Sequence, residues 1–214
     1  FTFTVVLPLG WSVYYSLFNW NGVSKMKFIG IDNYIKMFLD NNFLVSLKNN
    51  IFFMIVNVIG QVGIALLVAI LLTHIGKGRN LFKTIYFIPT ILSAVALAQF
   101  FRKFFGIEPV GVFNVLLDVL GMEDLQKAWL GESSTAMGAV IFIECYKSMP
   151  LYMVILYSGL VAIPDQIVEA ARMDGANKLQ EIFYIKVPGI KPVLLTALSV
   201  RIIDAAKTFD IIWA

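Results

Sequence analysis

Long apolar runs separated by short polar stretches dominate the chain. These runs lie near residues 1–18, 51–73, 84–105, 136–163 and 188–214. Each approaches the roughly 20 mostly apolar residues that an α-helix needs to cross a bilayer. The pattern therefore predicts an all-α, polytopic helical membrane protein with about five spans in a single transmembrane domain over residues 1–214. The sequence starts and stops within apolar runs, so we expect both termini to be truncated.

The polar stretches between the runs predict loops rather than further domains. Residues 74–83 form a short turn that holds Lys77, Arg79 and Lys83. Short loops rich in lysine and arginine stay on the cytoplasmic side of a membrane. Because the spans alternate in direction, the 164–187 loop lies on the same side as this turn. We therefore expect both to face the cytoplasm.

The composition identifies lipid as the solvent of this chain. Of its 214 residues, 59% are hydrophobic and only 14% are charged, and the mean hydropathy is +0.80. Soluble domains carry about 25% charged residues, so this chain has too few polar side chains to cover a surface that faces water. The net charge of +3 is small and no basic patch is interleaved with aromatic residues, so nucleic-acid binding is not indicated.

Several chemistries are excluded by the residue types present. Cys145 is the only cysteine and His74 the only histidine, so neither a disulfide framework nor a cysteine- or histidine-based metal site is indicated. The sequence also lacks the Gly-x-x-x-x-Gly-Lys-Ser/Thr pattern that cradles nucleotide phosphates. We therefore expect no catalytic residue, no metal and no cofactor on this chain.

The 164–187 loop carries the most informative pattern in the sequence. Its spaced elements are Glu169-Ala170-Ala171, then Asp174-Gly175, and then Ile185-Lys186-Val187-Pro188. Gly175 permits a tight or left-handed turn that a residue with a Cβ would resist. Asn177 and Gln180 fit a capping box at the start of a second helix. The pattern predicts a helix–turn–helix on the membrane face, with an ordinary interhelical hairpin as the alternative.

This spacing resembles the signature loop of the permease subunits of binding-protein-dependent ABC importers, with Val187 where that family has leucine. The resemblance extends to Leu7-Pro8, to the segment 28–34 (Phe-Ile-Gly-Ile-Asp-Asn-Tyr) and to Ile163-Pro164. Within the family, the chain is similar to the sugar permeases of the maltose and glycerol-phosphate type. The resemblance thus covers nearly the whole chain.

The resemblance implies a type I ABC importer permease bundle in a prokaryotic cytoplasmic membrane. The implied function is to form half of the translocation path for a carbohydrate. The implied partners are a second related permease subunit, an extracytoplasmic solute-binding protein and a cytoplasmic ATPase dimer, which would hold the ATP and Mg²⁺. The signature loop docks on this ATPase in the family, and the resemblance assigns that coupling role to Glu169, Ala170, Ala171, Asp174, Gly175, Ile185 and Pro188.

Charged side chains inside two predicted spans suggest where a substrate passes. Charges in a membrane are costly and normally face a cavity or a partner. Positions spaced i, i+3 and i+4 share one helix face, and two such faces in this chain match path-lining faces of the sugar permeases. The resemblance places Glu144, Lys147, Ser148, Arg201, Ala205 and Thr208 on the substrate path, with Thr90 as a weaker candidate.

Two alternatives remain at this point. The pairs Glu144–Lys147 and Arg201–Asp204 have the spacing of intrahelical ion pairs that only neutralise buried charge. A secondary transporter or channel subunit for a polar solute would also be polytopic and carry intramembrane charges, although it has no need for the signature loop.

Overall fold

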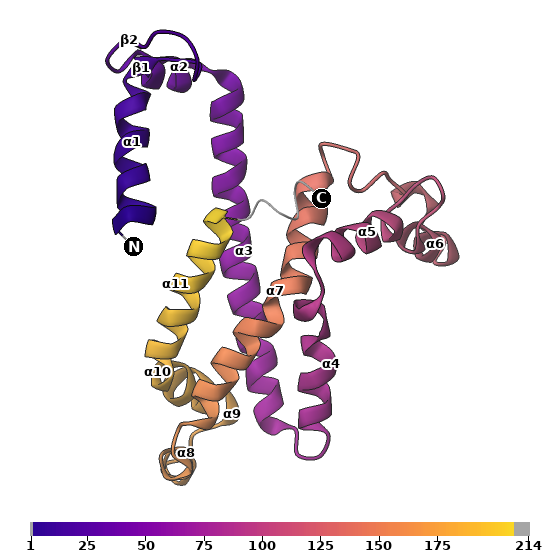
Figure 1. Ribbon diagram of the computed structural model, residues 1–214. Coiled ribbons are helices and arrows are strands. Elements are labelled where there is room, and N and C mark those ends of the chain that lie inside the picture. The colour runs from indigo at the N-terminus through magenta and orange to yellow at the C-terminus, as the bar shows by residue number, and fades with distance from the viewer. Residues whose placement is uncertain (1, 208–214) are drawn as a thin grey trace. The chain divides into compact units, whose positions relative to one another are not determined.

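The computed structural model describes residues 2–207 (Figure 1). It divides into two compact units, residues 1–52 and 53–214, and the division falls inside the long helix α3 (Asn41–His74). Each unit is described below by itself. The expectation of one domain over residues 1–214 stays a prediction.

The first unit is a helical hairpin closed by a small sheet. A π-helical turn (η1, Thr2–Val6) leads into α1 (Leu7–Ser16), so the first predicted span is helical where it is described. The strands β1 (Phe18–Asn19) and β2 (Lys27–Phe28) pair antiparallel, and α2 (Asp32–Leu39) precedes the start of α3. This two-stranded sheet was not predicted, because strands of two residues leave no periodic signal.

The segment 28–34 fastens the sheet to the end of α1. The side-chain amide of Asn33 donates to the backbone carbonyls of Ser16 and Phe18 at 2.8 and 3.0 Å. The Tyr34 hydroxyl lies 2.6 Å from Ser16 Oγ. The bond to Ser16 satisfies one of the carbonyls that the end of α1 leaves free. Together these contacts give the Asn33-Tyr34 pair a structural role.

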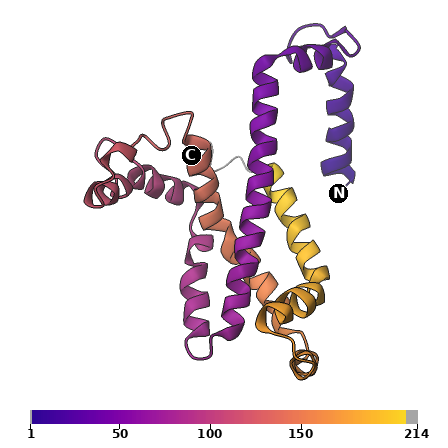
Figure 2. The same ribbon diagram turned by 180° about the vertical axis from the view of Figure 1, so that it is seen from behind.

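The second unit is a helical bundle that continues α3 from residue 53. Its further elements are α4 (Arg79–Ile91), α5 (Ala94–Phe104), α6 (Val112–Val119), η2 (Glu123–Leu125), α7 (Ala136–Val161), α8 (Asp165–Met173), α9 (Lys178–Gln180), η3 (Glu181–Lys186), α10 (Val187–Gly189) and α11 (Lys191–Lys207). Helices α4 and α11 both pack against α7, as the two opposite views show (Figures 1 and 2). The mainly helical class predicted from the sequence is confirmed.

Two helices in the described part, α3 and α7, are long and apolar enough to cross a membrane, and two bent pairs raise the number to four if each pair is one span. The run predicted as one span at 84–105 is such a pair, because α4 and α5 meet at 96°. Leu92 is extended, and the Ser93 hydroxyl caps α5 by accepting from the backbone N–H of Ala96. A cap of this kind starts a new helix.

The core of the second unit lies where α3, α7 and α11 meet. Ala65 and Ala69 of α3, Met153 and Leu156 of α7 and Ala197 of α11 are fully buried there. A Cβ built on Gly159 would lie 3.1 Å from a Val193 methyl carbon, so this glycine allows α7 and α11 to approach closely. Such small-residue contacts are typical of helices that pack within membranes.

Candidate functional site

Helix α8 begins and ends where its local sequence predicts. Pro164 precedes it in an extended conformation, and Asp165 stands in the first turn, where an acidic side chain is favourable. Gly175 has a φ of +85°, in the left-handed region. The amides of Gly175 and Ala176 donate to the carbonyls of Arg172 and Ala171, each at 3.0 Å. This is a Schellman ending, which needs a left-handed residue after the helix.

The second helix of the loop starts at a complete capping box. Asn177 Oδ1 accepts from the Gln180 amide at 2.9 Å, and Gln180 Oε1 accepts from the Asn177 amide at 2.8 Å. The predicted helix–turn–helix is therefore confirmed, and it projects beyond the end of α7 (Figure 1).

The predicted coupling residues lie mostly on the surface of this loop. Ala171 and Ile185 are half-buried, while the others are exposed: Glu169, Ala170, Asp174, Gly175 and Pro188. Large apolar side chains are exposed beside them, with Met173 at 89% and Tyr184 at 74% exposure. An exposed surface that combines apolar and charged groups suits contact with a protein partner.

An ion triad joins α8 to the following segment, and it was missed in the sequence. Glu181 Oε2 lies 2.9 Å from Arg172 Nε, and Glu181 Oε1 lies 2.7 Å from Lys186 Nζ. The hydrogen bond from Arg172 lowers the pKa of the Glu181 carboxyl, and the same bond raises the pKa of Arg172. The nine-residue separation of Arg172 and Glu181 across a turn carries no periodic signal.

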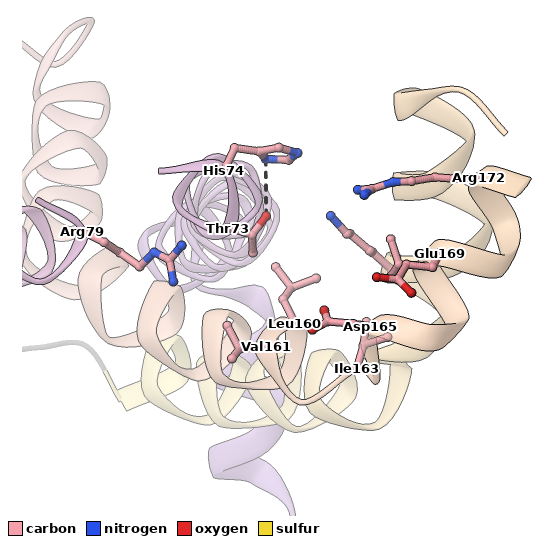
Figure 3. A pocket seen from close by; sticks show the side chains of 11 residues that line it. Thr73, His74, Arg79, Leu160, Val161, Ile163, Asp165, Glu169 and Arg172 are labelled. Carbon is pink, nitrogen blue, oxygen red and sulfur yellow. Dashed lines mark hydrogen bonds between the residues drawn. The ribbon is translucent and has the colours of Figure 1, made fainter. Parts of the chain in front are cut away.

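A polar cavity of about 360 Å³ lies beside this triad, between the loop and the helix ends (Figure 3). Thr73 and His74 from the end of α3 lie on one side of it, and Arg79 comes from the start of α4. Glu169 and Arg172 of α8 face it from the other side (Figure 3). Glu169 thus stands where the loop meets the ends of the membrane helices.

The predicted substrate-path residues come together only in part. Glu144 Oε1 accepts from Ser148 Oγ at 2.9 Å and lies 3.6 Å from Arg201 Nη1. Glu144 is 5% exposed and Arg201 only 1%. Glu144 therefore pairs across helices with Arg201, instead of forming the intrahelical pair with Lys147 that was the alternative.

The other path candidates have separate surroundings. Thr90 Oγ1 donates to the backbone carbonyl of Lys147 at 3.0 Å, which ties α4 to α7 and agrees with a packing role for Thr90. Asp204 accepts from the Tyr152 hydroxyl at 2.9 Å. Ala205 is buried, and Thr208 lies outside the described residues.

Asn57 and Gln61 of α3 lie beside α7, where Cys145 Sγ donates to Asn57 Oδ1 at 3.7 Å. With Glu144, Ser148 and Arg201 they form the buried polar cluster. Asn57 and Gln61 are fully buried, and Gln61 Nε2 donates to Asn57 Oδ1 at 3.0 Å. Among the residues described, Gln61 Oε1 and the Nε and Nη2 atoms of Arg201 are buried without a hydrogen-bond partner. Asn57 and Gln61 are four residues apart in the uncharged run 51–73, so they share one helix face. This spacing was a signal in the sequence that was not used. Ionisable side chains inside membrane helices commonly mark the path of a solute.

Within residues 2–207, no group of three histidine, cysteine, aspartate or glutamate side chains is placed to hold a metal ion.

Long apolar helices, a buried polar cluster and an exposed helix–turn–helix fit a membrane transport subunit. Residues 61–212 match the family described as the binding-protein-dependent transport system inner membrane component, and the chain belongs to this family. It is therefore a multi-pass membrane protein and the transmembrane permease subunit of an ABC importer, not an enzyme.

Relatives with assigned names agree with this class. The chain is 34% identical over 213 residues to the probable ABC transporter permease protein YurN of Bacillus subtilis, covering 98% of this chain and 73% of YurN. It is 31% identical over 191 residues to the trehalose/maltose transport system permease protein MalF of Thermococcus litoralis, covering 89% and 64%. The chain thus spans about two thirds to three quarters of the length of these relatives.

Solved structures show the same fold. One match is a chain of a bacterial ABC transporter involved in the import of the acidic polysaccharide alginate. The TM-score is 0.82 at 20% identity, and the match covers 97% of this chain and 70% of that chain. A second structure, the bacterial alginate ABC transporter in complex with an alginate pentasaccharide-bound periplasmic protein, matches with a TM-score of 0.80 at 20% identity, covering 94% and 67%.

Proposed function

We propose that this subunit forms half of a carbohydrate path across a prokaryotic cytoplasmic membrane. A second related permease forms the other half, and an extracytoplasmic binding protein delivers the sugar. ATP and Mg²⁺ bind a separate cytoplasmic ATPase dimer. The observation that carries the proposal is the exposed helix–turn–helix of residues 164–187, placed between two membrane helices.

The loop acts as the lever that receives the movement of the ATPase. Glu169 contacts the ATPase, Ala170 and Ala171 leave a small-residue face for close approach, and Gly175 sets the turn. The Schellman ending and the capping box support this role, because they hold the two short helices in one geometry without a protein core around them.

The carbohydrate assignment is supported by the relatives and by the polar cluster. MalF of Thermococcus litoralis is named for trehalose and maltose transport, and the solved structural neighbour is involved in the import of alginate. Sugar hydroxyls both donate and accept hydrogen bonds, so they suit the mixed donors and acceptors of Glu144, Ser148 and Arg201. We favour a neutral mono- or oligosaccharide. The second choice is a glycerol-phosphate-like substrate or an acidic sugar, bound through Lys147 and Arg201.

The test is reconstitution of the importer in lipid vesicles with the full-length chain. The complete complex should hydrolyse ATP faster when the sugar-loaded binding protein is added, and the sugar should enter the vesicle lumen. This subunit purified alone should hydrolyse no ATP. Hydrolysis by the isolated subunit, or uptake that ignores ATP, would contradict the proposal.

A further inference from the structure

The Arg172–Glu181–Lys186 ion triad connects two elements of different kinds. Arg172 belongs to α8, which is exposed and polar, while Glu181 and Lys186 belong to η3, which leads back into the membrane helices. The central carboxylate, Glu181, is the most buried member, with its side chain 4% exposed, against 11% for Lys186 and 58% for Arg172. The Arg172–Glu181 link therefore runs from the loop surface to a buried carboxylate.

The π-helical turn of η3 makes this arrangement possible. Residues five apart fall on different faces of an α-helix. In a π-helix each amide bonds to the carbonyl five residues earlier, so residues five apart lie nearly one above the other. Glu181 and Lys186 are the first and last residues of η3. The wider turn thus directs both side chains to one face, where Lys186 neutralises Glu181 and Arg172 binds the second carboxylate oxygen.

The segment after the triad is fixed to the helix that carries Arg201. The helical segment Lys178–Gly189 meets α11 at 69°. Ile190 at this bend is 1% exposed and belongs to the core shared with α3 and α7. A displacement of η3 is therefore passed to α11 through a packed joint, because packed cores transmit strain.

We infer that Arg172 and Glu181 are positioning residues that form a mechanical tie, through which movement of α8 is transmitted to α11 and its buried Arg201. This inference rests on the proposed function, in which α8 docks on an ATPase. Lys186 has a different role. Its ammonium group lies against Glu181 and stabilises the ionised carboxylate, which then remains available to Arg172.

The tie can be cut without leaving a lone buried charge. In Arg172→Gln, Glu181 keeps Lys186 as its partner, and position 172 is largely exposed, so the complex should assemble. The quantity to measure is the number of sugar molecules transported per ATP hydrolysed by the complete reconstituted importer. A purely structural role would lower the yield of assembled complex, whereas loss of the tie lowers this ratio.

We expect the ratio to fall about fivefold or more in Arg172→Gln, in the usual range for coupling between sites. Arg172→Lys keeps the charge and should retain most of the ratio. Lys36→Gln removes an exposed cation from α2, outside the loop of residues 164–187 and without an ion pair in the described part of the chain, and it should leave the ratio unchanged.

A double-mutant cycle separates a tie from a direct contact between Arg172 and the ATPase. Glu181 is buried, so Glu181→Gln can act only through its neighbours. The double variant Arg172→Gln/Glu181→Gln should have no lower ratio than either single variant, because both remove the same interaction. If Glu181→Gln reduces assembly, Glu181→Gln/Lys186→Met replaces it in the cycle, since no buried charge is then left unpaired.

An unchanged ratio in Arg172→Gln, or independent and additive losses in the double variant, would overturn the tie. These outcomes require a wild-type importer that couples hydrolysis to uptake. If the wild-type complex itself failed to couple them, the proposed function would fall, which is a different result.

Discussion

The coupling loop and the buried polar cluster differ in how their residues are held. In the loop, Gly175, Asn177 and Gln180 are held by bonds to neighbours within five residues along the chain. In the cluster, Glu144 is paired with Arg201 of another helix, and polar atoms of Gln61 and Arg201 stay unpaired. The loop is therefore rigid by local design, whereas the cluster depends on the packing of three helices.

This difference indicates a division of roles. A lever has to keep its shape when it is exposed to water, and locally closed hydrogen bonds provide that. A solute path has to offer bonding capacity, and buried unpaired donors and acceptors provide it at a cost in stability. Variants of the loop should therefore lose transport with little loss of stability. Removing one partner of the Glu144–Arg201 pair should lower both.

The largest effect is expected in the cluster. Arg201→Met leaves Glu144 charged and buried without its partner, which should destabilise the fold by about 3–5 kcal/mol. The double variant Glu144→Leu/Arg201→Met should recover most of this loss and still fail to transport. Thermal unfolding of the purified complex and sugar uptake measure the two effects. Normal uptake by the double variant would show that these charges serve only structure.

The close contact between α7 and α11 should come next. Gly159→Val places a Cβ 3.1 Å from a Val193 methyl carbon and should cost about 1–3 kcal/mol by overpacking. Gly138→Val in the same helix meets nothing within 4 Å and is the matched control. Thermal unfolding of both variants in detergent gives the comparison. Equal loss in the two variants would mean that helix propensity, and not packing, sets the effect.

A smaller effect is expected at the cap of the loop. Asn177→Ala removes the acceptor of the Gln180 amide and should cost about 1 kcal/mol locally. We expect faster amide hydrogen exchange over α9 with the membrane helices unchanged. Asn177→Asp keeps the acceptor and should exchange like the wild type. Changes that spread to α7 would show that the loop is not locally held.

The smallest effect should be acid sensitivity of the triad. The Glu181 pKa is lowered from its usual 4.5, so the pairing stabilises the loop above that pH and is lost as the pH falls through the lowered pKa. Hydrogen exchange in the loop should therefore report an opening below about pH 4.5 that is absent in Glu181→Gln. An identical pH profile in the two proteins would contradict the ion triad.

The contrast between local and long-range contacts also explains which features could be predicted from the sequence. The turn at Gly175 and the cap at Asn177 were predicted because each depends on residues within a few positions. The 96° break between α4 and α5 was not predicted, because the apolar run continues on both sides of Leu92 and Ser93. Only the cap geometry at Ser93 marks the break.

Long-range partners were the harder part. Glu144 and Arg201 were named as candidates, but their pairing across α7 and α11 depends on how the helices pack. The Arg172–Glu181 contact depends on a π-helical turn, for which the sequence has no known periodic signature. Asn57 and Gln61 did carry a signal, two polar side chains on one face of an apolar run, and attention to that face would have found them.

The central claim is that the exposed loop transmits ATP hydrolysis on another chain into transport by this one. The most direct measurement is the number of sugar molecules moved per ATP hydrolysed by reconstituted importers that carry Gly175→Val or Glu169→Lys. Valine at a φ of +85° strains the turn by about 1–3 kcal/mol and misplaces the lever, while the membrane helices are untouched. We expect both variants to assemble with the ATPase and to lose most of their transport. Normal transport by both variants, with the ATPase bound, would show that this loop has no coupling role.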